Sequence, residues 1–507
     1  MLKLHESTGN AKRSAPGIRQ HRLQQSGPIA LGMLGTRASL GLLSFVMVAG
    51  CSVGPRYKPP VPSLTPFMTA PQIAARKATN PSPKIETWWT GFEDPTLSRM
   101  IQRVLDQNLS IAASLARVDQ SRAIARRAGA RNKPNFTLAA DTTTLRQSLE
   151  SPFGKVSKYV PSYPRNQNYY DLGIAASWEL DLFGQLRKGA QAASADAQAT
   201  EANRAGVQIS VTAEAADAYL QLRGDQARIA VAQQQIADDE HLLKLVVQRY
   251  QAGVATDRER AQAEALLQQA RASVPLLQLD LATQSNRLDV LMAAQPGAYA
   301  AELAQPSPIP TLPSIDPLAP LDVLRRRPDV IAAERRLAAS NSRIGAALAG
   351  YYPTVSLSAL VGSESLSPGH LFKEVTFQPE SVVGIRWRLF DFGRVGAEVA
   401  QARGANAEAL IAYRETMLRA AEDVEDAFYA LTKSESRLGL IFTEVASLQR
   451  ARDLSQQSYL AGTIPLTDVL DADRQLLAAQ DDLAANRTSS ARAAVGSFRA
   501  LGGGWNP

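Results

Sequence analysis

Three short motifs occur twice in this chain, and in each case the second copy lies 209 residues after the first, as from Trp178 to Trp387. The pairs are Trp178–Gly184 (WELDLFG) with Trp387–Gly393 (WRLFDFG), Asp217–Leu222 (DAYLQL) with Asp426–Leu431 (DAFYAL), and Tyr250–Gly253 (YQAG) with Tyr459–Gly462 (YLAG). One such match could arise by chance, but three at one spacing indicate two homologous halves. The chain is therefore expected to fold as two copies of one plan.

Each half predicts the same order of elements. A helical segment comes first, at about 95–132 and about 320–350, and two strands follow it. The apolar residues that alternate with polar or small ones in these strands are Phe136, Leu138, Ala140, Leu172, Ile174, Ala176, Trp178, Leu180 and Leu182, then Val355, Leu357, Ala359, Val383, Ile385, Trp387 and Leu389. A period of two residues places one face of a strand in an apolar medium and the other in a polar one.

A long helical hairpin is predicted after the second strand of each half. No proline interrupts residues 185–274 or 393–464, and the stretch from Gly184 to Tyr250 would form a helix of roughly 100 Å. Gly253 and Gly462 each follow a tyrosine by three residues, where a turn between antiparallel helices favours glycine. The returning helices are expected to end near residues 294 and 501. The alternative for this region alone is an ordinary soluble helical bundle.

Two strands per half give four per chain, and their alternation suits an outer-membrane barrel with an apolar exterior and a polar lumen. In lipid no strand edge stays open, because each unsatisfied backbone group costs several kcal/mol. Four strands cannot close alone, and an eight-stranded barrel is filled by side chains, so a conduit needs at least three chains. The alternative is a soluble four-stranded sheet packed on helices.

The beginning of the chain predicts export and lipidation. An apolar run at residues 38–48 follows Arg37 and precedes small residues, which is typical of a secretory signal. The run is too short to span a bilayer. The sequence from Val48 to Cys51 (VAGC) resembles a lipoprotein cleavage site, so we expect residues 1–50 to be removed and Cys51 to carry N-palmitoyl and S-diacylglycerol groups. The alternatives are a start at Met33 instead of Met1, and a lone buried thiol in a chance apolar segment.

The remaining composition argues against a nucleic-acid partner, a metal site and an enzyme. Six of the 55 basic residues and one of the 48 acidic residues lie in 1–50, so the formal net charge of the rest is +2 instead of +7. After the leader, Cys51, His241 and His370 are the only Cys and His residues, too few for a usual zinc site. The chain has no nucleophile elbow, P-loop or dinucleotide-binding motif. We therefore expect no cofactor other than the covalent lipid.

Several ordered motifs together resemble the outer-membrane channels of the TolC/OprM type. The resemblance is specific to the NodT-like lipoprotein branch, which serves tripartite efflux pumps, and it covers essentially all of the chain after residue 50. The segments that carry it are Cys51–Pro60, Arg327–Val330, Ala333–Glu334, Ile344–Gly345, Pro353, Trp387–Gly393 and Tyr459–Asp471.

This resemblance implies a mixed α/β membrane protein in which a long α-helical barrel continues into a transmembrane β-barrel built from four strands per chain. It implies a homotrimer in the outer membrane, anchored by lipid, with its helical domain in the periplasm. The implied partners are a periplasmic adaptor (membrane fusion) protein and an inner-membrane RND transporter, and drugs or other small compounds would pass through without chemistry. The corresponding regions are the signal peptide (1–50), the lipidated N-terminal segment (51–93), the first repeat (94–295), the Pro-rich equatorial connector (296–322), the second repeat (323–501) and the C-terminal tail (502–507).

The resemblance also assigns a periplasmic gate at the second helical tip. Asp468 and Asp471 align with two aspartates that narrow the closed pore, and Tyr459 aligns with a tyrosine that helps to hold the closed state. Ile464 stands where the best-known member has an arginine, so a latch using that charge is not expected. The alternative is that Asp468 and Asp471 are solvated carboxylates at a helix start, stabilised by the helix dipole.

Contacts with the adaptor are expected at both tips, through Tyr250, Gly253, Gly462 and Thr463. The first tip, at residues 256–260 (TDRER), lacks the aspartate spacing of the second. Two other functions stay open at this stage. One is a lipid-anchored periplasmic scaffold that binds partners without conduction, and the other is an outer-membrane exit duct for type I protein or metal-ion export.

Overall fold

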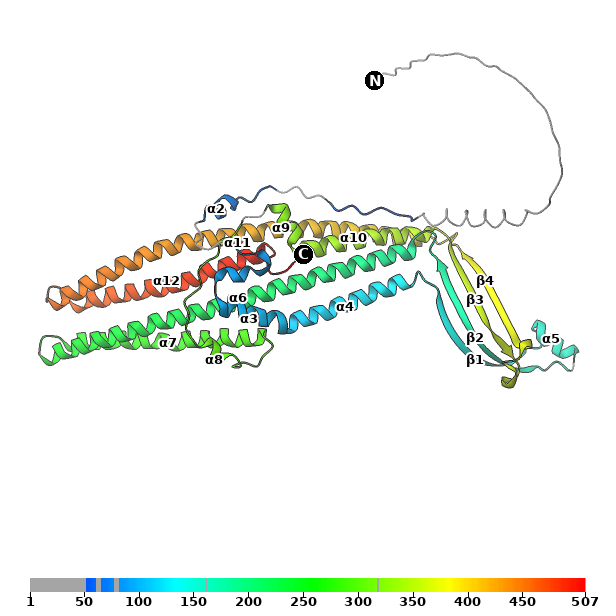
Figure 1. The fold of residues 1–507 in the computed structure, drawn as a ribbon, viewed down its shortest axis with the longest axis horizontal. Coiled ribbons are helices and arrows are strands. Elements are labelled where there is room, and N and C mark those ends of the chain that lie inside the picture. Colours follow the sequence, from blue (N-terminus) through cyan, green and yellow to red (C-terminus); the bar gives the residue numbers. More distant parts are fainter. Residues whose placement is uncertain (1–51, 61–64, 77–81, 161, 317–318, 507) are drawn as a thin grey trace, which may run out of the picture. The chain divides into compact units, whose positions relative to one another are not determined.

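The computed structural model describes residues 52–60, 65–76, 82–160, 162–316 and 319–506 (Figure 1). The predicted leader and Cys51 lie outside these ranges. The elements of the first half are α2 (Ala70–Ala74), η2 (Ile85–Phe92), α3 (Pro95–Gln107), α4 (Leu109–Ala130), β1 (Asn135–Arg146), α5 (Pro152–Tyr159), β2 (Asn166–Leu180), α6 (Gln185–Gln251), α7 (Asp257–Leu291) and α8 (Ala300–Leu303). Those of the second half are α9 (Pro320–Arg326), α10 (Pro328–Leu348), η3 (Ala349–Tyr351), β3 (Thr354–Ser365), η4 (Pro368–His370), η5 (Glu374–Thr376), β4 (Phe377–Arg386), α11 (Arg394–Leu460) and α12 (Leu466–Ala500).

Two pairs of long antiparallel helices dominate the chain. The runs without proline predicted the two longest helices, α6 and α11, whereas α7 continues through Pro275. Helices α6 and α11 each have 67 residues and begin 209 positions apart, at 185 and 394. Helices α7 and α12 each have 35 residues and begin at 257 and 466, at the same offset. Many buried positions of α6 are alanines, and one group of them packs against Ala332, Ala338 and Ala339 of α10. Small side chains let α6 and α10 approach closely where these alanines meet. None of the described helices is both long and apolar enough to cross a membrane.

The four strands form one antiparallel sheet in the order β1-β2-β3-β4. The register collects the alternating apolar residues on one face: Leu138 pairs with Ile174, and Ile174 pairs with Val361. These three side chains are more than half exposed in the single chain. Among the described residues, β1 and β4 have no strand partner on their outer sides. The sheet thus presents an apolar face and two open edges to its surroundings.

Both predicted helical segments that precede the strands are interrupted, contrary to the single helices expected. In the first half the break is at Asn108, whose side-chain Oδ1 accepts hydrogen bonds from the N–H groups of Ser110 and Ile111 and so starts α4. Its Nδ2 donates to the Leu291 carbonyl at 2.8 Å. In the second half the break is at Arg327, because a residue before proline disfavours the helical conformation. Helix α5, in the loop between β1 and β2, was not predicted either.

The apolar core lies where the short elements pack on the middle of the long helices. Trp88 of η2 stacks on Phe498 of α12 with ring centroids 5.4 Å apart, and both side chains are buried. Tyr219 of α6 is buried in the same core, and its hydroxyl donates to Asp94 Oδ2 at 2.6 Å. The described N-terminal segment is tied to α11, where Thr69 Oγ1 donates to Glu425 at 2.6 Å. These contacts fix the middle of the helices and leave the hairpin tips as a separate packing unit.

Candidate functional site

The two hairpins end in turns of the same geometry. Gly253 and Gly462 both have φ of +73°, a left-handed conformation in which a Cβ would be strained. The first turn is followed by a capping box: Thr256 Oγ1 accepts from the Glu259 N–H, and the Glu259 carboxylate accepts from the Thr256 N–H. In the second turn, the N–H and Oγ1 of Thr463 both donate to the Ser458 carbonyl. The glycine positions predicted for the turns are therefore confirmed.

The predicted gate aspartates lie on the exposed side of α12. Asp468 and Asp471 are exposed, whereas Leu466, Val469 and Leu470 are buried. Asp468 is in the first turn of the helix, where a carboxylate is favoured by the helix dipole. Asp471 Oδ2 accepts a hydrogen bond from Gln475 Nε2 at 2.9 Å. One side of this helix start is available for packing against the first hairpin, and the other presents two carboxylates to solvent.

Tyr459 lies at the contact between the two hairpins. Its side chain is only 3% exposed, and it belongs to an apolar cluster built from all four long helices. The members of this tip cluster are Leu242 and Val246 of α6, Ala263 and Leu266 of α7, Tyr459 of α11, and Leu466, Val469 and Leu470 of α12. Ile464, which stands where the best-known channel of the TolC/OprM type has an arginine, is partly buried against the same cluster. Of the residues assigned to the gate, Tyr459 thus lies in this interface, whereas Asp468 and Asp471 lie outside it.

Arg249, which the sequence analysis did not single out, supplies a cation to this interface from the other hairpin. Its guanidinium carbon lies 4.7 Å from the centre of the Tyr459 ring, a distance at which the ring face attracts a cation. The corresponding position in the second half, 209 residues later, is Ser458, so the repeat gave no indication of this role. The tip therefore has a cation over its tyrosine even though Ile464 carries no charge.

The tip interface also buries polar atoms that find no hydrogen-bond partner among the described residues. They are Arg249 Nε, Gln262 Oε1 and the Tyr459 hydroxyl oxygen. Burial raises the pKa of Tyr459, so its hydroxyl stays protonated and polar. A buried polar group without a partner costs about 1–3 kcal/mol. The contact between the hairpins is consequently less stable than its apolar area alone would make it.

The residues predicted to contact an adaptor are on the outside of the tips. Tyr250 is 43% exposed, and Arg260 of α7 lies over its ring at 5.6 Å. Gly253, Gly462 and Thr463 are also exposed. Tyr250 and Tyr459 occupy equivalent positions in the two halves, yet only Tyr459 is buried. Of these two tyrosines, only Tyr250 of the first hairpin is therefore available to a partner.

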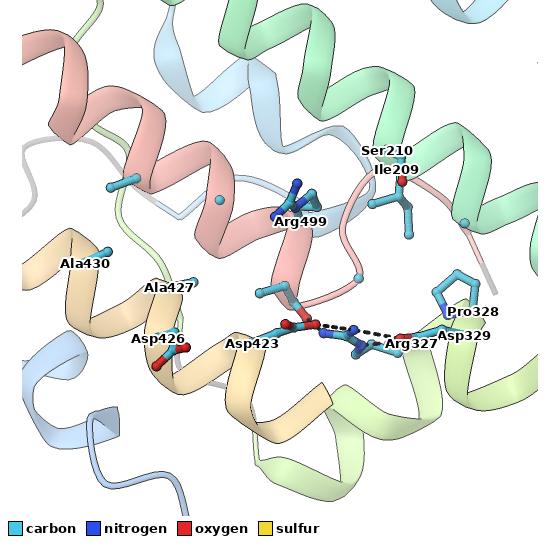
Figure 2. A pocket seen from close by; sticks show the side chains of 15 residues that line it. Ile209, Ser210, Arg327, Pro328, Asp329, Asp423, Asp426, Ala427, Ala430 and Arg499 are labelled. Atoms are coloured by element: carbon cyan, nitrogen blue, oxygen red, sulfur yellow. Dashed lines mark hydrogen bonds and ion pairs between the residues drawn. The ribbon is translucent and has the colours of Figure 1, made fainter. Parts of the chain in front are cut away.

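A hollow lies at the middle of the long helices, where α10 begins and α12 ends. It has a volume of about 460 Å³, and Figure 2 shows Arg327, one of the residues that line it, between Asp329 and Asp423. Arg327 Nη2 lies 2.7 Å from a carboxylate oxygen of each aspartate, and its Nη1 donates to the Ala500 carbonyl at 3.1 Å. Arg327 thus joins three helices, which explains the Arg-Pro-Asp motif as a structural one.

Comparison with known proteins decides the family. The profile of the family described as "Outer membrane efflux protein" matches residues 100–294 and 319–503. The chain belongs to this family. The pyoverdine export outer membrane protein OpmQ of Pseudomonas aeruginosa is 31% identical over 427 residues, which cover 83% of this chain and 88% of that protein. Nodulation protein T of Rhizobium leguminosarum bv. trifolii is 27% identical over 467 residues, covering 91% and 96% of the two chains.

The fold of this outer membrane efflux protein also matches solved channels. The outer-membrane channel OprN superposes with a TM-score of 0.83 at 30% identity, and the match covers 90% of this chain and 100% of that one. The resemblance to TolC/OprM-type channels is therefore confirmed. The protein is an outer-membrane efflux channel with a periplasmic helical domain, and its relatives are transport proteins, not enzymes. Within the described residues, no group of three or more His, Cys, Asp or Glu side chains could hold a metal ion.

Proposed function

We propose that three copies of this chain form the outer-membrane duct of a tripartite efflux pump. The duct would passively conduct drugs or other small compounds that a periplasmic adaptor and an inner-membrane RND transporter deliver. The observation that carries the proposal is the sheet, whose exposed apolar face and two unpaired edges need both lipid and further strands. The following paragraphs give the support for each part.

The sheet supports insertion by several chains together. Its apolar row continues across the strands, since Trp178 pairs with Leu357 and Leu357 pairs with Val383. An apolar face of this kind suits lipid, but β1 and β4 still expose backbone N–H and C=O groups that lipid cannot satisfy. Pairing β4 of one chain with β1 of the next removes both edges. Three chains with four strands each give a twelve-stranded barrel, wider than the eight-stranded barrels that side chains fill.

The helices support the same trimer. Helix α11 carries an exposed apolar stripe, whose members are Ile411, Leu418, Tyr429, Leu440 and Leu454, each more than half exposed. Their spacings of 7, 11, 11 and 14 residues keep them within about 20° of one line on a helix. Helix α7 exposes Leu276, Leu279 and Val290 to a similar degree. Exposed apolar stripes on the two outer helices suit packing between neighbouring chains.

The partners and cargo follow from the tips and the relatives. Exposed Tyr250, Gly253, Gly462 and Thr463 are the proposed contacts for the adaptor, because they lie at the ends of the hairpins farthest from the strands. A relative in Pseudomonas putida is described as a toluene efflux pump outer membrane protein, and OpmQ is described as a pyoverdine export protein. Small organic molecules are accordingly the proposed cargo.

The assembly is tested by purifying the full protein in mild detergent and measuring its mass by light scattering and its conductance in planar bilayers. A trimer with stable single-channel currents is expected. A monomer whose sheet-edge amides are protected from exchange would contradict barrel closure. A trimer that carries no current under any condition would instead favour the periplasmic scaffold.

Lipid anchoring is a separate part of the proposal and rests on the VAGC sequence before Ser52. Intact-mass analysis of the membrane-extracted protein is expected to find a chain that begins at Cys51 with three acyl chains. Replacing Cys51 with serine should remove the lipid, while the strands still allow insertion of the barrel. An unmodified thiol, or a mature chain that begins elsewhere, would show that the lipidation assignment is wrong.

A further inference from the structure

Where α6 of the first hairpin packs against α11 and α12 of the second, the contact, or seam, buries a carboxylate. Only one of its two oxygens accepts a hydrogen bond from a described residue. Asp239 of α6 is 2% exposed. Its Oδ1 accepts a hydrogen bond from Gln235 Nε2 at 2.7 Å, but its buried Oδ2 has no partner in the described part of the chain. A buried carboxylate oxygen without a hydrogen-bond partner makes the folded state less stable when the group is ionised. When the group is protonated, that cost falls.

The groups that face Asp239 from the neighbouring helices contain more acid than base. Helix α12 contributes Asp473, which is 4% exposed, and α6 contributes the adjacent Asp238. Among the described residues, the cation that lowers the pKa of Asp239 is Arg452 of α11. Its Nε donates to Asp473 Oδ1 at 2.8 Å, and its Nη1 lies 3.5 Å from Asp453 Oδ1. Arg271 of α7 also lies beside this part of α6, but its Nη2 is paired with Glu240 Oε1 at 2.7 Å. Asp239 therefore has no cation of its own.

The same arrangement occurs a second time on α6, fourteen residues earlier. Asp225 is fully buried, Gln221 four residues before it donates to its Oδ1 at 2.9 Å, and its Oδ2 is another buried oxygen without a partner in the described residues. Asp280 of α7 faces it, while Arg228 and Arg492 are paired with Asp481 and Asp217. Fourteen residues are two heptads, so both aspartates fall on one seam of a supercoiled helix.

We propose that Asp239 is a proton-operated clasp, which holds the two hairpins together when it is protonated and loosens their seam when it is ionised. This inference rests on the proposed function in one respect: separation of the two hairpins is taken to be the opening of the channel. The clasp is a property of the α6, α11 and α12 seam, and it is distinct from the aromatic contact at Tyr459. It makes closure depend on the pH of the compartment around the helices.

The direction of the pH effect follows from the burial of the carboxylate. Burial, with repulsion from Asp473 and Asp238, raises the pKa of Asp239 from 3.8 to about 6. A group with a raised pKa stabilises the packed state at low pH, and this stabilisation is lost as pH rises towards the raised value. If separation exposes Asp239 to water, the ratio of closed to open hairpins should fall about tenfold between pH 5 and pH 7.5.

The clasp is tested by measuring the distance between spin labels on the two tips of the full protein as a function of pH. Suitable label positions are Val254→Cys and Thr463→Cys, because both side chains are exposed. The closed population should fall as the pH rises from about 4 to about 6 and level off above that range. Asp239→Asn, which keeps the shape of the side chain, should lose most of this fall. Asp473→Asn should make the fall smaller and end it at a lower pH, since it removes a repelling charge and frees Arg452.

The control is Asp453→Asn, an exposed carboxylate beside the same arginine, which should keep the wild-type pH dependence. A distance distribution that does not change with pH would overturn the clasp and leave the proposed channel intact. A pH response in Asp239→Asn as large as that of the wild type would also overturn it. A pH-dependent distance in a protein that never conducts would leave the clasp in place and overturn the channel proposal instead.

Discussion

Replacing Tyr459 with alanine is expected to increase the open probability of the channel roughly thirtyfold. The side chain is 3% exposed and contacts residues of both hairpins. Truncating a large buried aromatic residue destabilises the closed state by about 3–5 kcal/mol. Removing a buried hydroxyl without a hydrogen-bond partner stabilises it by about 1–3 kcal/mol. A net loss of about 2 kcal/mol from the closed state corresponds to the stated factor. Single-channel recordings in planar bilayers measure the change directly.

The phenylalanine variant at the same position gives a result of opposite sign. Tyr459→Phe keeps the ring under Arg249 and removes only the hydroxyl that lacks a partner in the described chain. It should therefore close the channel further, lowering the open probability by about fivefold if about 1 kcal/mol is gained. A structural defect from any substitution at this position would instead open the channel in both variants.

Tyr250→Ala is the matched control for this pair. Tyr250 is the equivalent residue of the first hairpin, 209 positions earlier, but it is 43% exposed and lies outside the tip cluster. Its truncation should leave the open probability nearly unchanged while weakening binding of an adaptor. Equal opening by Tyr250→Ala and Tyr459→Ala would mean that the tip cluster does not hold the hairpins together.

The features that the sequence predicted are those set by local or periodic rules. A run without proline is free to form a helix of 67 residues, and a glycine after the YxxG tyrosine supplies the positive φ of each turn. Alternation along a strand fixes which face is apolar, and the observed register aligns Leu138, Ile174 and Val361 on that face. The repeat doubles each of these signals. The long helices, their turns and the apolar faces of the strands therefore follow from the sequence.

The features that the sequence did not predict depend on which residue of one element meets which residue of another. Arg249 is one of many arginines in the chain, and only the packing of α6 against α11 places it over Tyr459. Asp239 lies in a polar run of α6, and nothing in the sequence indicates that its side chain is only 2% exposed. Asn108 interrupts a predicted helix because the Leu291 carbonyl, far along the chain, accepts its amide. Such pairings between distant segments leave no periodic pattern.

Replacing both Asp468 and Asp471 with alanine is expected to abolish block of the channel by multivalent cations. In the proposed trimer, three copies of each residue surround one axis and place six carboxylates near the aperture. Carboxylates close together bind divalent and trivalent cations, because the ion replaces their repulsion with attraction. Sub-millimolar divalent or trivalent ions on the periplasmic side should therefore reduce the wild-type current. In the double variant, ion concentrations at least about tenfold above the wild-type blocking concentration should leave the current unchanged, which corresponds to a loss of more than about 1.4 kcal/mol of ion binding.

Because the two aspartates are exposed, their replacement should change ion block without changing the stability of the protein or the closure of the channel. Both are exposed and outside the apolar tip cluster, so the double variant should unfold at nearly the wild-type temperature, because exposed carboxylates contribute little to folding. Asp257→Ala removes an exposed carboxylate at the start of α7 and should leave the block unchanged. Persistent block in the Asp468→Ala, Asp471→Ala channel would place the acidic constriction elsewhere, and these two residues would then be ordinary carboxylates at the start of a helix. Loss of block together with an unchanged response to Tyr459→Ala would show that ion binding and hairpin packing act at the same tip but through different side chains.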